Sequence, residues 1–366
     1  MSAGPLTGLR VVDLSRYIAG PLCAMTLADL GADVVKVESP NGDPSRREGP
    51  WIGEESLYFA QMNRNKRGVT IDLRSEDGRA ELARLLDDAD VLVENFRPGV
   101  LDAIGFGRAE LERRWPRLVV ANVTGYGRAS AMGEAPAFDA ILQASTGLAM
   151  VSGDTDAPQL IGAYVVDVGA ALLATIGVLA ALRQRDEQER GQEVDVSLLD
   201  AALVLLGAAV PVAAATGEAP ERVGSFDRTE APAGPFRAGD GWIYMQAGSD
   251  RFFPLLAAAM ERPDLAEDPR YRSHAGRIEH RAELEAEVAA WVGGLTVDEL
   301  TARLAEHPIP LARVRTVDEA VRDPELGIER YLVDVVGATG AVVPTLLTPI
   351  RFSAADVTVR HDVPRR

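Results

Sequence analysis

The sequence is poor in the residues that build disulfide frameworks and metal sites. Its 366 residues include one cysteine, Cys23, and four histidines. A single cysteine excludes an internal disulfide framework and suits a reducing compartment. The histidines show no metal-ligand spacing, so we expect no bound metal. They are His274, His280, His307 and His361.

Signature motifs of nucleotide and hydrolase chemistry are also missing. No Gly-Lys pair follows a glycine-rich loop, and no G-x-G-x-x-G follows the first expected strand. These absences argue against a P-loop and against a dinucleotide-binding oxidoreductase of the usual kind. The sequence also lacks the G-x-S-x-G elbow of serine hydrolases. A carboxylate is therefore the leading catalytic candidate by elimination.

Positive charge is scarce, with 38 Lys and Arg against 55 Asp and Glu and a net charge of −17. This balance argues against nucleic-acid and anionic-membrane partners, and an anionic ligand would need a local basic pocket. The N-terminal segment lacks a secretory signal pattern, and the apolar run 168–182 is short for a membrane span. We expect a cytoplasmic protein without a membrane partner.

Strand and helix patterns alternate through the first half of the chain. Such a rhythm predicts an α/β fold with a largely parallel sheet covered by helices on both faces. The expected strands are 9–14, 33–38, 68–73, 91–94, 118–123 and 194–198, and the expected helices are 20–30, 76–89, 108–114, 168–182 and 199–215. The charged segment 183–190 is expected to be a solvated turn.

The length of the chain predicts two domains. We expect a large domain over 1–215 and a linker rich in Gly, Pro and charge over 216–241. A smaller α+β domain is expected over 242–316, because helix patterns there mix with short strands such as 242–246 and 310–314.

Asp167 is the only charge in the apolar stretch from Ile161 to Leu182. A carboxylate in such surroundings is costly unless its charge is stabilised. A position at or just before the start of helix 168–182 would supply free N–H groups and a favourable dipole. Two interpretations stay open: an ionised, poorly hydrated nucleophile, or an N-cap on a buried helix.

A series of short motifs carries a resemblance to a known family. The motifs are LRVVDLSRYIAGP over 9–21, LGADVVKVE over 30–38, NRNKR over 63–67, VENFRPG over 93–99, GYG over 125–127, RGQ over 190–192 and RVRTV over 313–317. In this order and spacing, the chain resembles the class III coenzyme A transferases. That group includes formyl-CoA:oxalate transferase, carnitine CoA-transferase and the related alpha-methylacyl-CoA racemases.

The resemblance implies a Rossmann-like large domain with an open parallel sheet and a small α+β domain. Two chains would form an interlocked homodimer, and segment 317–366 would return to the large domain. The implied activity moves CoA from an acyl-CoA to a carboxylic acid, with CoA thioesters as substrates and no permanently bound cofactor.

The family's nucleophilic aspartate corresponds to Asp167 in this chain. The resemblance implies that its carboxylate attacks the acyl-CoA thioester, forms a mixed anhydride and releases the CoA thiolate. The thiolate then forms an aspartyl-CoA thioester, from which the acceptor carboxylate takes CoA.

CoA-binding residues are also implied by the resemblance. The positions that match the family's binding segments are Arg16, Tyr17, Ala19, Asn95, Phe96 and Arg97. Lys66 and Arg67 are candidate phosphate partners, or alternatively a solvated cluster at a strand end. The family's adenine-facing arginine is Ser39 here, so Arg46 or Arg47 is expected to take that role.

The pair Phe138 and Asp139 distinguishes reactions within the family. Racemases place a histidine where this chain has Phe138, and phenylalanine cannot exchange a proton. Asp139 is expected to orient the site or to be a structural, hydrogen-bonded aspartate. Some members of the family have a glycine-rich loop, and the nearest candidate for that loop in this chain is segment 224–234.

The alternatives to a transferase are a racemase or other CoA-thioester isomerase, a non-catalytic CoA-binding protein and a nucleotide-binding oxidoreductase.

Overall fold

The computed structural model describes residues 4–151, 153 and 157–365. Over these residues the chain separates into two compact units. The larger unit takes the described parts of 1–148, 160–216 and 328–366, and the smaller unit takes those of 149–159 and 217–327.

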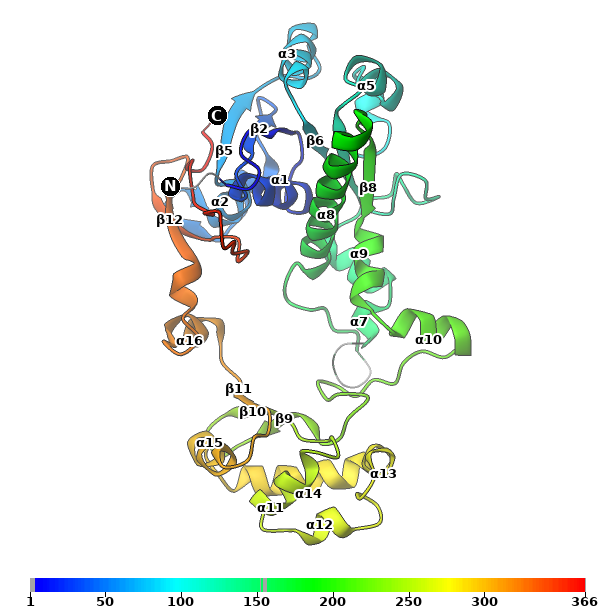
Figure 1. Ribbon diagram of the computed structural model, residues 1–366, viewed down its shortest axis with the longest axis vertical. Coiled ribbons are helices and arrows are strands. Elements are labelled where there is room, and N and C mark those ends of the chain that lie inside the picture. The colour runs from blue at the N-terminus through cyan, green and yellow to red at the C-terminus, as the bar shows by residue number, and fades with distance from the viewer. Residues whose placement is uncertain (1–3, 152, 154–156, 366) are drawn as a thin grey trace. The chain divides into compact units, whose positions relative to one another are not determined.

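Within the described residues, the larger unit contains a six-stranded, entirely parallel sheet with the order β5-β2-β1-β6-β7-β8 (Figure 1). Its strands are β1 (Arg10–Asp13), β2 (Asp33–Glu38), β5 (Lys66–Thr70), β6 (Val91–Glu94), β7 (Val119–Thr124) and β8 (Glu193–Ser197). The parallel α/β fold predicted from the sequence is confirmed. β2 and β6 have the predicted bounds, whereas β5 begins two residues before the predicted strand.

The helices of the larger unit cover both faces of this sheet. The helices of this unit are α1 (Ala19–Asp29), α2 (Leu57–Asn63), α3 (Glu76–Asp87), α4 (Val100–Ala103), α5 (Arg108–Arg114), α6 (Asp139–Ser145), α8 (Val165–Gln188), α9 (Leu198–Leu205) and α10 (Ala209–Thr216). All residues of α7 (Leu148–Val151) except the first belong to the smaller unit. Short elements in the same part of the chain are η1 (Pro44–Arg47), β3 (Trp51–Ile52) and β4 (Glu55–Ser56). The predicted helix 199–215 is interrupted between α9 and α10, where Gly207 has a φ of 54°.

Strand alternation divides the core of the larger unit into two layers. Val11 and Val91 point to the face that α1 and α8 cover, whereas Val12 and Leu92 point to the face of α3, α4 and α5. Alternate side chains of a strand point to opposite faces, so a parallel sheet with helices on both sides needs apolar residues at successive positions. The continuous apolar runs in these strands therefore specify a buried sheet.

The strand order reverses between β1 and β6, which pair side by side although they are far apart in the sequence. From β1 the sheet grows through β2 to β5 on one side, and from β6 through β7 to β8 on the other. In open α/β sheets, the loops at the carboxyl ends of the strands diverge at such a switch point and leave a crevice for a ligand. This topology places the loops after β1 and β6 next to each other.

α8 is longer than the sequence indicated. By length and composition it is apolar enough to cross a membrane, but it packs against α1, α9 and β7 as part of the core. The predicted turn over 183–190 is wrong, because the helix continues to Gln188. Arg183 pairs with Glu187 one turn later, and Arg185 is buried beside Asp90, with 2.8 Å between Nη1 and Oδ1. Charged residues of this kind are good helix formers, so charge alone did not mark the end of the helix.

The smaller unit has its own apolar core around an antiparallel sheet with the order β11-β10-β9. Its elements are β9 (Ala233–Arg237), β10 (Trp242–Gln246), α11 (Phe253–Ala259), α12 (Asp264–Glu267), α13 (His274–Glu279), α14 (Arg281–Gly293), α15 (Val297–Ala305), β11 (Leu311–Arg313) and α16 (Val317–Arg322). The expected linker 216–241 thus includes a strand, β9, that pairs along its full length with β10. Because this strand contains Gly and Pro, its composition resembles that of a loop, and the sequence therefore indicated a linker there.

The C-terminal segment belongs to the larger unit from Ile328 onward, eleven residues later than the sequence suggested. It contains η2 (Ile328–Tyr331), β12 (Leu332–Val336) and β13 (Val342–Leu346), and Figure 1 shows β12 beside α2. Val335 and Val343 pack with Phe59 of α2 in one apolar cluster. Arg360 donates to the carbonyl oxygens of Ala28, Gly31 and Ala32, at 2.6 to 2.9 Å, and so satisfies the end of α1.

Candidate active site

A cavity of about 890 Å³ lies within the larger unit, at the carboxyl ends of β1, β6 and β7. It occupies the switch point of the sheet, where the topology leaves room for a ligand. Among the residues singled out from the sequence, those that line it are Arg16, Tyr17, Ala19, Asn95, Phe96, Arg97, Phe138, Asp139 and Asp167. The fold therefore gathers residues that are up to 151 positions apart in the sequence.

Two loops supply cations to one part of the cavity wall. Arg16 follows β1 and its guanidinium lies 5.2 Å from the ring centroid of Phe96, which follows β6. Arg97, the next residue, is exposed. Within the described ranges, neither Arg16 nor Arg97 forms an ion pair. Free guanidinium groups are well suited to phosphates, so this part of the wall has the charge that an anionic ligand would need in an acidic protein.

Asp167 lies in the first turn of α8, as its third residue. Asp139, at the start of α6, accepts hydrogen bonds through Oδ2 from the backbone N–H groups of Val166, at 2.7 Å, and Asp167, at 3.0 Å. Its Oδ1 accepts from Gln143 Nε2 at 2.5 Å. The interpretation of Asp167 as the N-cap is therefore wrong. Asp139 satisfies the helix start, which leaves the Asp167 carboxylate free to face the cavity.

Burial and the nearby charge of Asp139 raise the pKa of Asp167 to about 7. In the described part of the chain, no hydrogen-bond donor contacts the Asp167 carboxylate. The sequence predicts an ionised, poorly hydrated carboxylate; a pKa near 7 places ionisation of Asp167 close to neutral pH. A weakly solvated carboxylate with a raised pKa is a stronger nucleophile when ionised than one in water.

Aromatic side chains surround the space next to Asp167. Phe138 is 58% exposed and makes an edge-to-face contact with Tyr17, at 6.0 Å between ring centroids. Tyr58 and Tyr164 form a second such pair at 5.8 Å, and both line the cavity. Phe138 has no titratable group, so its side chain cannot donate or accept a proton in this cavity.

Sequence reasoning missed several residues of the cavity wall. These are Tyr58, Arg74, Gln143 and Tyr164. Gln143 could have been found, because it stands one helical turn after Asp139 and thus shares its face. Tyr164 precedes Asp167 by three residues. Tyr58 carried no signal, because only the packing of α2 brings it to the cavity.

The structure excludes Lys66 from the phosphate site that the sequence suggested. Lys66 is 1% exposed, does not line the cavity, and donates to Asp13 Oδ2 at 2.8 Å and Asn63 Oδ1 at 2.9 Å. It is the first residue of β5, not a solvated strand end, and its side chain points inward. Arg67 points outward and pairs with Asp33, with 2.7 Å between Nη2 and Oδ2, so it does not line the cavity either.

Arg46 also departs from its expected role. Its guanidinium pairs with Glu38, lies 3.7 Å from the ring centroid of Phe59, and donates to the carbonyl of Pro364. These hydrogen bonds engage Nε and Nη2 of Arg46, and neither Arg46 nor the exposed Arg47 lines the cavity. Ser39 lies outside the cavity lining, and segment 224–234 belongs to the smaller unit.

Comparison with known proteins gives a consistent assignment. Residues 6–366 match the model of CoA-transferase family III. A succinyl-CoA–D-citramalate CoA-transferase from Chloroflexus aurantiacus is 37% identical, with 90% of this chain and 83% of that protein covered. An acetyl-CoA:oxalate CoA-transferase from Acetobacter aceti is 33% identical, with coverage of 96% and 90%.

Solved structures share the whole fold. A CAIB/BAIF family protein from Brucella suis has 34% identity and a TM-score of 0.87, and 100% of this chain and 97% of that chain are covered. A hypothetical protein from Mycobacterium tuberculosis has 30% identity and a TM-score of 0.88, with the same coverage. The resemblance inferred from the sequence is confirmed: the chain belongs to CoA-transferase family III and is a CoA-transferase.

Proposed function

We propose that this enzyme moves CoA from an acyl-CoA to a carboxylic acid through covalent intermediates on Asp167. The observation that carries the proposal is the position of Asp167: its carboxylate faces a cavity whose wall also holds Arg16 and Arg97. CoA combines an anionic nucleotide end with a reactive thioester end. A site with free cations and a poorly solvated carboxylate suits both ends.

The proposed chemistry begins with attack of an Asp167 carboxylate oxygen on the thioester carbonyl. The C–S bond breaks, CoA leaves as the thiolate, and a mixed anhydride joins Asp167 to the acyl group. The thiolate then attacks the aspartyl carbonyl, which releases the first acid and leaves an aspartyl-CoA thioester. Each step exchanges one acyl bond for another, so no oxidant, reductant or external proton source is required.

The second half of the cycle repeats these steps in reverse order. The acceptor carboxylate attacks the aspartyl-CoA carbonyl, releases the thiolate and forms a second mixed anhydride. Attack of the thiolate on the acceptor carbonyl then produces the new acyl-CoA and regenerates the Asp167 carboxylate. Water can hydrolyse the anhydride and thioester intermediates. A cavity that holds the thiolate close to the carbonyl favours CoA transfer over this hydrolysis.

Mass spectrometry of trapped enzyme tests this proposal directly. Incubation with an acyl-CoA, followed by hydroxylamine or borohydride, should modify the peptide that contains Asp167, because anhydrides and thioesters react with both reagents. The first donors should be acetyl-CoA and succinyl-CoA, which the names of the relatives suggest, and the first acceptors small dicarboxylic acids. Modification at another carboxylate, with none on that peptide, would reject Asp167 as the nucleophile.

Replacement of Arg97 by alanine should weaken CoA binding about 10- to 100-fold, since charge-assisted hydrogen bonds contribute roughly 1.5–3 kcal/mol each. Isothermal titration calorimetry with CoA measures this loss. Arg113→Ala is the matched control, because Arg113 is an exposed arginine of α5 that pairs with Glu110 outside the cavity. Equal affinities of the two variants would remove Arg97 from the site.

We further propose that the enzyme is an interlocked, cytoplasmic homodimer. An apolar stripe at one-turn spacing is exposed on α8: Val168 at 38%, Leu172 at 50% and Ile176 at 62%. The described residues of α10 also include no buried side chain, although the helix is apolar. Exposed apolar surface of this extent is typical of an interface, and a second copy of the chain would cover it.

Light scattering at micromolar concentration should give twice the chain mass of 39.1 kDa and should show little dissociation on dilution. The double substitution Leu172→Glu and Ile176→Glu should produce monomers or insoluble protein, because it places charges on the stripe. Arg113→Glu provides a control with a surface charge change on another helix. A monomeric wild-type protein would contradict the dimer.

A further inference from the structure

We propose that a buried ion network is a positioning device that holds the turn after β1 in the conformation that binds acyl-CoA. The network consists of Asp13, Lys36, Asp43 and Lys66. The turn comprises residues 15–17 and contributes Arg16 and Tyr17 to the cavity wall. The inference rests on the proposed function, since it takes this cavity to be the acyl-CoA site.

The four charged side chains of the network are almost completely buried, with exposures of 2% or less. Asp13, the last residue of β1, lies opposite Lys36, which is two residues before the end of β2. Lys66 Nζ lies 2.8 Å from Asp13 Oδ2, and Lys36 Nζ lies 2.8 Å from Asp43 Oδ2. The two positive and two negative charges balance, which is the condition under which buried ions are tolerated.

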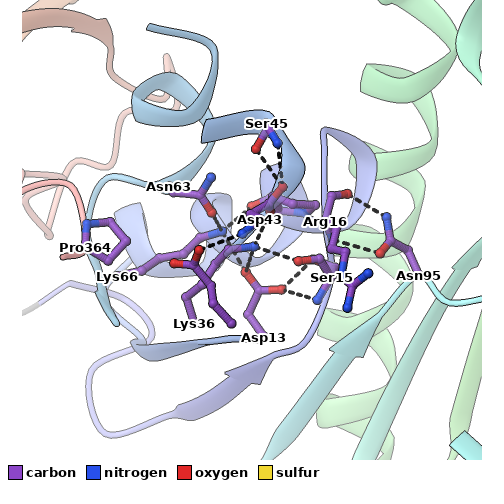
Figure 2. A network of polar contacts seen from close by, with 12 residues as sticks. Asp13, Ser15, Arg16, Lys36, Asp43, Ser45, Asn63, Lys66, Asn95 and Pro364 are labelled. Carbon is purple, nitrogen blue, oxygen red and sulfur yellow. Dashed lines mark hydrogen bonds and ion pairs between the residues drawn. The ribbon is translucent and has the colours of Figure 1, made fainter. Parts of the chain in front are cut away.

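The network contacts the backbone of the turn from the buried side (Figure 2). Lys36 Nζ donates to the carbonyl oxygen of Ser15 at 2.6 Å, and the N–H of Ser15 donates to Asp13 Oδ1 at 2.9 Å. The N–H of Tyr17 donates to Asp43 Oδ1 at 3.4 Å. Both polar backbone atoms of Ser15 and the amide of Tyr17 are therefore held by members of the network.

Asn95, in the loop after β6, completes the hold on the turn. Its Oδ1 accepts from the N–H of Arg16 at 2.8 Å, and its Nδ2 donates to the carbonyl oxygen of Arg16 at 2.7 Å. Gly20 allows the start of α1 to pack closely against Ser15, because a Cβ atom at position 20 would lie 2.3 Å from Ser15 Cβ. Asn95 therefore positions Arg16, in addition to lining the cavity itself.

Tyr17 shows why the turn needs such support. Its φ is 65°, in the left-handed region that side chains other than glycine rarely adopt. A conformation of this kind persists where the surroundings determine it, and such sites are concentrated where ligands bind. The network and Asn95 therefore fix Arg16 and Tyr17 before the ligand arrives, which lowers the entropy that binding must overcome.

The charges of Lys36 and its carboxylate partners are maintained near neutral pH. Although burial alone would lower it, the Asp13 and Asp43 carboxylates raise the pKa of Lys36. Burial acts to raise the pKa of Asp43, but Lys36 outweighs it and holds that pKa below its ordinary value. The ion pair therefore persists under the conditions in which CoA affinity would be measured.

The double substitution Lys36→Met and Asp43→Asn removes the Lys36–Asp43 ion pair and the longer contact of 4.0 Å between Lys36 and Asp13, while Asp13 keeps Lys66 as its partner at 2.8 Å. Removing both charges avoids the unpaired buried ion that a single substitution would leave. CoA affinity, measured by calorimetry, should fall on the order of 10- to 100-fold, as small misplacements of binding groups can cause. Arg64→Met with Asp29→Asn is the matched control, because that pair is equally buried but lies outside the cavity lining.

Combination with Arg16→Ala separates positioning from a general loss of stability. If the network acts through Arg16, the loss from Lys36→Met with Asp43→Asn should shrink when Arg16 is already absent. Fully additive losses, or the same loss in the Arg64 and Asp29 control, would overturn the inference. Failure of the wild-type enzyme to bind CoA would instead reject the proposed function.

Hydrogen exchange of the wild-type protein provides a test that needs no variant. The amides of residues 15–17 should exchange slowly in the free protein, because the network already holds them. Rapid exchange that only CoA slows would show that the ligand forms the turn, and would overturn the inference even if the double variant failed to fold.

Discussion

Replacement of Asp167 by asparagine is expected to abolish CoA transfer while fold and CoA binding persist. The substitution keeps the shape of the side chain but removes the nucleophilic carboxylate, so the rate should fall by at least about 10⁴-fold, as when other covalent nucleophiles are removed. Transfer assays and calorimetry with CoA on the same preparation measure the two properties separately. Near-normal transfer would reject the covalent mechanism.

The same variant should be more stable than the wild type at alkaline pH. The pKa of Asp167 is raised from 3.8 to about 7 in the folded protein, so folding favours the protonated form. Protonation of Asp167 therefore stabilises the folded state. This contribution to the free energy of unfolding is fully present below pH 3.8 and is lost as the pH rises through about 7. Asparagine does not ionise, so Asp167→Asn should gain roughly 2–4 kcal/mol at pH 8. Urea unfolding should show this gain shrinking toward pH 4, and a constant gain would contradict the raised pKa.

Replacement of Asp139 should affect both the position and the ionisation of Asp167. Asp139→Ala removes the acceptor for the N–H groups of Val166 and Asp167, which should cost roughly 0.5–2 kcal/mol of stability. It should also lower transfer about 100-fold, because the first turn of α8 then loses its fixed geometry. Thr296→Ala, which removes the cap of α15, is a control for cap loss alone.

Asp139→Asn distinguishes the charge of Asp139 from its hydrogen bonds. Asparagine keeps an oxygen that accepts from the α8 backbone but carries no charge, so the pKa of Asp167 should fall below 7. In the wild type, the rate of covalent adduct formation should rise with pH around a midpoint near 7. That midpoint should move to lower pH in Asp139→Asn, and an unchanged midpoint would show that the Asp139 charge does not act on the nucleophile.

The elements with strong local patterns could be predicted from the sequence. The Val- and Leu-rich segments 33–38 and 91–94 were predicted with the bounds of β2 and β6, and Gly and Pro signals located the start and end of α1 to within one residue. Charge misled where it was taken as a sign of a turn, because residues 183–188 continue α8 through Arg183, Arg185 and their partners. The orientation of Lys66 was also difficult to predict from the sequence. The predicted strand began two residues after the true start of β5, so Lys66 was left outside the strand and was interpreted as solvated, whereas its side chain points inward.

The sequence by itself determined the family and the parallel α/β class, and it marked Asp167 as an isolated charge in an apolar segment, because ordered motifs, apolar periodicity and an isolated charge are all local properties. Only the tertiary structure decided how these residues work together. The strand order brings the loops after β1 and β6 to one cavity, and Asp139 reaches across 27 residues to cap α8. The same folding turns Lys36 and Lys66 inward beneath the Arg16 turn. Such contacts depend on which strands pair and which helix faces meet, and local periodicity carries no information about either.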